Sequence, residues 1–119
     1  MKNIAFLFSK SPYGSVSCKE CLDMALSVSL IIKNVGIFFL GDGILQVISN
    51  QKSNKIFSFN YSKSFSILEI YKMSNIYFYK DSLKERGIKI NENFLVKPTF
   101  LKKKDFIKKL SLFDFIINC

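Results

Sequence analysis

The first residues with the types and spacing for chemistry are Cys18 and Cys21, a C-x-x-C pair at the start of a helix-like segment. A thioredoxin-like redox pair occupies this position after a first strand, because a helix N-terminus lowers the pKa of a thiol. Glu20 lies between the two cysteines and opposes thiolate formation, and Cys21 is expected to face the core beside Leu22. We therefore interpret the pair as two small, half-buried hydrophobic side chains, with a thiol oxidoreductase as the alternative.

Composition excludes most other catalytic chemistry. The 119 residues contain no histidine, so Ser-His or Cys-His nucleophile pairs and histidine-ligated metal sites cannot form. Cys119, the last residue, is interpreted as incidental, because three cysteines make neither a disulfide framework nor a good zinc-ligand spacing. We predict no catalytic, cofactor-binding or metal-binding residue, and the chain is not expected to be an enzyme.

Two loops that follow strands could approach an anion. Around the loop 9–14, the hydroxyls of Ser9, Ser11 and Ser15 could bind an anion at the N-terminus of the next helix, although a capped turn explains them equally well. Gly41-Asp42-Gly43 follows the second strand but lacks the third glycine and the Lys-Ser/Thr of nucleotide-binding loops. A tight turn is therefore expected at 41–43.

The charge is strongly basic, since 18 Lys+Arg oppose 9 Asp+Glu to give +9. Such a charge attracts polyanions, and a lysine cluster at 102–104 and 108–109 could touch RNA phosphates. Arg86 is the single arginine, however, and the abundance of Lys, Asn, Ile and Phe is what A/T-rich codons would produce. We favour a solvated outer helix face for these lysines over contact with RNA.

The elements that must position these residues are short strands alternating with helices. The predicted strands are 3–8, 35–40, 75–79, 94–100 and 113–117. The predicted helices are 17–33, 62–71, 81–86 and 103–112, with a short helical turn at 43–49. Pro98 predicts that its strand ends early or lies at an edge, and Gly87 predicts a left-handed helix end. The strand at 113–117 is expected to be buried.

Apolar periodicity predicts which side chains face inward. In the first and last helices these are Leu22, Leu26, Leu30, Phe106, Ile107 and Leu110. Thirteen Phe and five Tyr are more aromatic surface than a domain of this size easily buries. Tyr77 and Tyr79, or Phe57 and Phe59, alternate where one face could lack a helix cover. A leftover apolar patch of this kind implies a partner subunit.

These patterns predict one α/β domain over residues 1–119, a small parallel-sheet sandwich with helices on both faces. In such a fold the working residues belong at the carboxyl ends of strands, here 9–14, 41–43 and 79–82. No apolar run approaches the ~18–20 residues that a membrane span needs. Residues 1–8 lack the features of a signal peptide, so a cytoplasmic location is expected.

Four segments together resemble the TusC/DsrF family within the DsrE/DsrF/DsrH sulfur-carrier superfamily. They are I-A-F-L-F-S-K-S-P-Y-G-S at 4–15, I-F-F-L-G-D-G-I-L-Q at 37–46, Y-K-D-S-L-K-E-R-G-I at 79–88 and F-D-F-I-I-N at 113–118. The likeness covers essentially the whole chain, and F-L-G-D-G-I-L-Q and L-K-E-R-G are its most specific parts.

The resemblance implies a small α/β subunit that assembles with TusB-like and TusD-like siblings into a heterohexamer, a dimer of BCD trimers. That complex relays persulfide sulfur from TusA to TusE toward the 2-thiouridine at the wobble position of tRNA. No cofactor is implied, and direct contact of this chain with tRNA is not expected.

The resemblance also bears on where sulfur would be carried. In the TusD-like sibling the persulfide cysteine ends the strand before the helix that closes with Arg-Gly, which corresponds here to Tyr79. A phenol cannot carry a persulfide, and Cys18 and Cys21 lie elsewhere in the pattern. The resemblance therefore implies a non-catalytic subunit that positions the thiol-bearing sibling.

Overall fold

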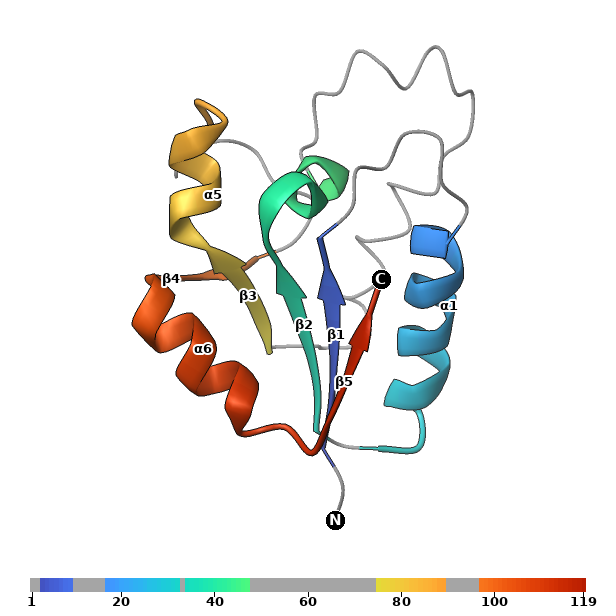
Figure 1. The fold of residues 1–119 in the computed structure, drawn as a ribbon. Helices are drawn as coiled ribbons and strands as arrows, with labels where there is room; N and C mark the ends of the chain where they lie inside the picture. The colour runs from blue at the N-terminus through green and yellow to red at the C-terminus, as the bar shows by residue number, and fades with distance from the viewer. Residues whose placement is uncertain (1–2, 10–16, 33, 48–74, 90–96) are drawn as a thin grey trace.

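The chain is organised around a parallel β-sheet, shown by the computed structural model in Figure 1. The structure describes residues 3–9, 17–32, 34–47, 75–89 and 97–119, with the backbone alone for 17–19 and 45–47. The strands are β1 (Ile4–Phe8), β2 (Val35–Phe39), β3 (Ile76–Tyr79), β4 (Thr99–Leu101) and β5 (Phe115–Asn118). They lie in the order β4-β3-β2-β1-β5 with every pairing parallel, which confirms the predicted fold class.

Helices cover both faces of this sheet, as predicted (Figure 1). The helical segments are α1 (Ser17–Ser29), the 3-10 helix η1 (Gly41–Val47), α5 (Lys80–Glu85) and α6 (Lys103–Ser111). Successive strand side chains point to opposite faces, so Phe6 and Phe8 pack in the layer under α1, whereas Ala5 and Leu7 pack under α6. Within the described ranges, no helix is long and apolar enough to span a bilayer.

Phenylalanine fills both layers of the core. The fully buried ones are Phe6, Phe8, Phe38, Phe39 and Phe78. In the layer under α6, Phe38 meets Phe106 and Phe113 edge-on, with ring centroids 5.3 and 5.5 Å apart. This geometry brings the positive edge of one ring to the negative face of another, which adds to the stabilisation from burial.

Two apolar side chains that were expected to face inward lie on the surface. Leu30 is 74% exposed because α1 ends at Ser29, whose hydroxyl donates to the Leu26 carbonyl at 2.7 Å. In α6, Phe106 is buried and Leu110 packs beside it, but Ile107 is 55% exposed. The prediction was wrong for Leu30 and Ile107, since each helix buries a narrower stripe than the sequence pattern indicates.

The strand predicted as a buried end of the chain is an edge strand. β5 pairs with β1 on one side, and the sheet order places no described strand on its other side. Phe115 and Ile116 are consequently 49% and 43% exposed, and the preceding Leu112 is 63% exposed. The strand exists where the sequence predicts it, but the expectation of burial was wrong.

The aromatic face predicted to lack a cover is covered. Tyr77 and Tyr79 of β3 are half-buried against α6, and the Tyr79 ring lies 5.4 Å from that of Phe106. Phe57, Phe59 and the helix predicted at 62–71 lie outside the described residues. β4 begins just after Pro98, so the strand predicted at 94–100 does not end early, but it lies at the opposite edge from β5, the second alternative that the proline predicts.

Candidate functional site

The carboxyl ends of β2 and β3 bring together two segments that the sequence analysis singled out. β2 and β3 are parallel neighbours, with Phe39 opposite Phe78, so the segments that follow them emerge at the same edge of the sheet. η1 follows β2 and α5 follows β3, and both lie at this edge in Figure 1. The predicted positions 41–43 and 79–82 therefore belong to one site.

The Gly-Asp-Gly segment is a tight turn in which the amides of both glycines already have hydrogen-bond partners. Gly41 has a φ of +57°, a left-handed conformation that favours glycine, and its N–H donates to the hydroxyl of buried Ser82 at 2.8 Å. The Gly43 N–H donates to the Leu40 carbonyl at 3.0 Å, and a Cβ on Gly43 would collide with the carbonyl of Phe8. With these donors used internally, the segment is a structural turn rather than a phosphate cradle, as predicted.

Arg86 joins this turn to the end of α5. Its Nε donates to Asp42 Oδ1 at 2.9 Å, and its Nη1 donates to the Ser82 carbonyl at 3.2 Å. Gly87 follows with a φ of +65°, and the N–H of Ile88 donates back into the last turn of α5, which ends the helix as the sequence predicts. The two segments most specific in sequence thus bind each other directly.

Tyr79 ends β3, at the position where a persulfide cysteine was considered. Its hydroxyl donates to Asp81 Oδ2 at 3.2 Å. Partial burial of the phenol, and then the hydrogen bond and negative charge of Asp81, raise the pKa of Tyr79 above its ordinary value. The side chain is therefore a neutral phenol at physiological pH, with no nucleophilic character.

A small apolar groove lies between α6 and the sheet beside this phenol. Its volume is about 270 Å³, and it is lined by Leu7, Leu40, Tyr79, Lys103, Phe106, Ile107 and Leu110. Apolar atoms, including the ring of Tyr79, make up nearly all of the surface of this lining. The groove can bury an apolar group, and the described residues that line it include no thiol and no acid–base pair.

A larger basic cavity of about 610 Å³ lies between α5 and the start of α6. It is lined by Lys80, Asp81, Leu83, Lys84, Ile88, Lys102, Lys103 and Lys104. None of its five lysines forms an ion pair with a residue that the structure describes. The predicted lysine cluster is divided, because Lys109 lies over the Tyr77 ring, 5.7 Å from its centroid, and not at this cavity.

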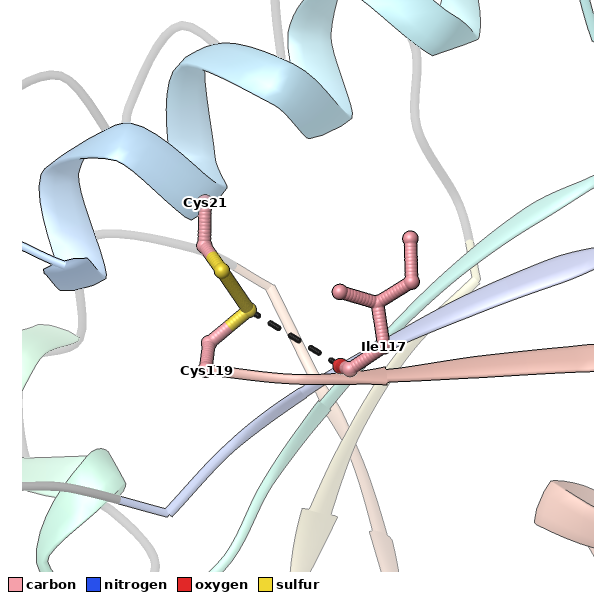
Figure 2. The surroundings of a disulfide bond; sticks show 3 residues. All are labelled: Cys21, Ile117 and Cys119. Atoms are coloured by element: carbon pink, nitrogen blue, oxygen red, sulfur yellow. Dashed lines mark hydrogen bonds between the residues drawn. A yellow bond between two sulfur atoms is a disulfide. The ribbon is translucent and has the colours of Figure 1, made fainter.

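The cysteines are arranged differently from the sequence prediction. Cys21 of α1 and Cys119, directly after β5, form a disulfide with their Cα atoms 5.9 Å apart, shown in Figure 2. Treating Cys119 as incidental was therefore wrong, and a Cys18–Cys21 redox pair is not formed, because the Cys21 sulfur is bonded to Cys119. Cys21 packs against the core as expected. Only the backbone of Cys18 is described by the structure.

A topological signal could have identified this pairing. β5 lies beside β1, and α1 is the helix that follows β1 and packs on its face. A residue just past β5 and a residue early in α1 therefore meet at the same edge. Of the hydroxyls predicted to bind an anion, Ser9 is exposed, and Ser11 and Ser15 lie outside the described residues.

Comparison with known proteins identifies a family that matches nearly the whole chain, close relatives in sequence and a solved structure with the same fold. The DsrE/DsrF-like family matches residues 2–119. "Protein TusC" of Buchnera aphidicola subsp. Acyrthosiphon pisum (strain 5A) is 44% identical over 118 residues, covering 99% of each chain. "Protein TusC" of the subspecies from Schizaphis graminum is 45% identical with the same coverage. The crystal structure of the ychN protein from E. coli shares the fold, with a TM-score of 0.80, 17% identity and full coverage of both chains.

Proposed function

The chain belongs to the DsrE/DsrF-like family, and from this we propose that it is the TusC-type, non-catalytic subunit of a sulfur relay. In this proposal one domain over residues 1–119 assembles with TusB-like and TusD-like siblings in a cytoplasmic heterohexamer, a dimer of BCD trimers. The complex passes persulfide sulfur from a TusA-like to a TusE-like carrier, toward 2-thiolation of the wobble uridine of tRNA. The curated TusC relatives support this assignment.

The observation that carries the non-catalytic role is Tyr79. It ends β3, and α5 with Arg86 and Gly87 follows directly, so it holds the position that the family resemblance assigns to a sibling's sulfur-carrying cysteine. The phenol is neutral and lies in the apolar layer under α6. Cys21 and Cys119 belong to the other layer, under α1, so neither thiol substitutes for the missing one.

The β5-edge patch supports a role in assembly. We use this name for Leu112, Phe115 and Ile116, which are 63%, 49% and 43% exposed. Phe115 and Ile116 are consecutive in a strand and so point to opposite sides of the sheet, which makes the edge apolar on both sides. Fully burying side chains of this size contributes about 1.5–3 kcal/mol each, so a sibling that covers the edge gains affinity.

The decisive test of the non-catalytic role is a relay reconstituted with a chain that lacks all thiols. Cys18→Ser, Cys21→Ser and Cys119→Ser are combined, and complex assembly and wobble-uridine thiolation are measured together. We expect thiolation to continue at the wild-type level in the assembled complex. Loss of thiolation from a complex that still assembles would transfer the chemistry to this chain and overturn the proposal.

A second test addresses assembly at the β5-edge patch. Ile116→Asp would force an unpaired carboxylate into the interface, which costs about 3 kcal/mol or more and weakens binding by roughly a hundredfold. Ile31→Asp is the matched control, because Ile31 is 87% exposed and lies outside the patch. Co-purification with the siblings should be lost for Ile116→Asp and retained for Ile31→Asp. Equal retention by both variants would remove the patch from the interface.

A further inference from the structure

We propose that Cys21 and Cys119 form a reversible dithiol–disulfide pair, which exchanges with low-molecular-weight disulfides and thiols and whose oxidation ties the end of β5 to α1. The two cysteines are 98 residues apart in sequence, yet their Cα atoms lie 5.9 Å apart (Figure 2). This separation falls within the range that a disulfide requires. The proposal rests on this geometry and is independent of the proposed relay function.

The sheet holds Cys119 in place without help from the disulfide. The Cys119 N–H donates to the Leu7 carbonyl at 2.8 Å, and its own carbonyl accepts from the Ser9 N–H at 3.5 Å. These bonds continue the pairing of β5 with β1, so the backbone of Cys119 is positioned whether or not the sulfur is bonded. The Cys21–Cys119 disulfide can therefore form and break without a rearrangement of the β5 backbone, which favours a reversible bond.

In the reduced state, the buried thiol of Cys119 has a hydrogen-bond acceptor nearby. Cys119 Sγ lies 3.8 Å from the carbonyl oxygen of Ile117, the contact drawn in Figure 2. Only a thiol carries a hydrogen to donate there, so this contact becomes a hydrogen bond when the disulfide opens. Both oxidation states are thus accommodated by the same backbone.

Exposure gives the two cysteines different roles in exchange. Cys119 is 2% exposed, whereas Cys21 is half-buried, so a small disulfide or thiol reaches Cys21 first. In oxidation, the Cys21 thiolate attacks a small disulfide RSSR, forms a mixed disulfide and releases RS⁻. The Cys119 thiolate then attacks the Cys21 sulfur, closes the internal disulfide and releases the second RS⁻.

The overall exchange is balanced. Two cysteine thiols lose two electrons and two protons, and RSSR takes them up to become two RSH molecules. Reduction runs through the same mixed disulfide in reverse.

Oxidation has a defined structural consequence. The bond closes a loop of about 100 residues, which in the chain-entropy account shifts the unfolding equilibrium on the order of a thousandfold toward the folded state. It also anchors the edge strand that carries Phe115 and Ile116 of the β5-edge patch. Amide hydrogens of β5 should therefore exchange more slowly in the oxidised protein than in the reduced protein.

The test uses the full chain, reduced with dithiothreitol and then treated with oxidised glutathione. Thiol titration of Cys18→Ser should fall from two free thiols to none, and peptide mapping of the wild type without reductant should join the Cys21 peptide to the Cys119 peptide. Cys18→Ser should form the same crosslink as the wild type. In the Cys18→Ser background, Cys119→Ser should stop at one glutathione on Cys21, and Cys21→Ser should react slowly because the remaining thiol, Cys119, is buried.

Two results would overturn the proposal. One is a wild-type chain that keeps all three thiols free under oxidised glutathione while folded. The other is a crosslink that joins Cys18 to Cys21 instead. The wild-type measurements decide the matter alone, so the test does not depend on whether the variants fold.

Discussion

Replacing Ser82 with alanine tests whether the contact between the 41–43 turn and α5 is held mainly by its buried hydrogen bond. Ser82 is 2% exposed, and its hydroxyl accepts the N–H of Gly41 at 2.8 Å. Ser82→Ala leaves that N–H without its acceptor in a part-buried contact. A fully buried donor left in this way costs about 1–3 kcal/mol, so the free energy of unfolding should fall by an amount in the lower part of this range.

The ion pair in the same contact should matter less. Arg86 Nε lies 2.9 Å from Asp42 Oδ1, but the two side chains are 27% and 53% exposed. Water screens such a pair, and its contribution to stability is about 0–1 kcal/mol. Asp42→Ala is therefore expected to destabilise the protein by clearly less than Ser82→Ala, although it removes the more conspicuous contact.

Urea denaturation of the reduced protein, followed by far-ultraviolet circular dichroism, measures both effects. Ser111→Ala is the matched control, because the Ser111 hydroxyl donates to the Lys108 carbonyl at 2.7 Å on an exposed helix surface. We expect the midpoint to shift most for Ser82→Ala, with an unchanged slope, and little for Ser111→Ala. An Asp42→Ala loss equal to or larger than the Ser82→Ala loss would refute this account of the contact.

Three further predictions follow from individual side chains. The phenolate absorbance of Tyr79, identified as the part of the signal that Tyr79→Phe removes, should appear only above pH 10, and Asp81→Asn should lower the midpoint of this titration. Because the pKa of Tyr79 is raised in the folded state, the stability linked to the neutral phenol is present below about pH 10 and is lost as the pH rises through the folded pKa. Gly43→Ala should cost about 1–3 kcal/mol in a urea titration, because its Cβ collides with the Phe8 carbonyl; wild-type stability would contradict the collision. Lys103→Gln should leave thiolation and the salt dependence of RNA binding by the assembled complex unchanged, because the lysine is interpreted as part of a solvated helix face; a slope that falls by about one unit would instead assign Lys103 a phosphate contact.

The central strands β1 and β2 were predictable because they are covered on both faces. A parallel strand between two helical layers is apolar at nearly every position, so β2, with its Val-Gly-Ile-Phe-Phe sequence, stands out as a continuous run. Gly87 was equally predictable, because a glycine after a short helix is the common way to end it in left-handed backbone. These features depend on local sequence, which is why they can be recognised without the fold.

The errors concern features that depend on the order of the strands. The apolar run of β5 would look the same in a central strand, so the exposure of Phe115 and Ile116 follows only from the sheet order. The pairing of Cys21 with Cys119 likewise requires knowing that β5 lies beside β1. Spacing along the chain instead drew attention to the adjacent C-x-x-C, which the fold does not join.

The contact between the 41–43 turn and α5 also limits how this surface can vary. The Ser82 hydroxyl accepts from an amide that the left-handed backbone of Gly41 positions, and Arg86 pairs with Asp42 across the same contact. Neither segment can be exchanged for an unrelated one without mismatching the other. A chimera that takes the 41–43 turn from a homologue should therefore keep its stability only when α5 is taken from the same homologue.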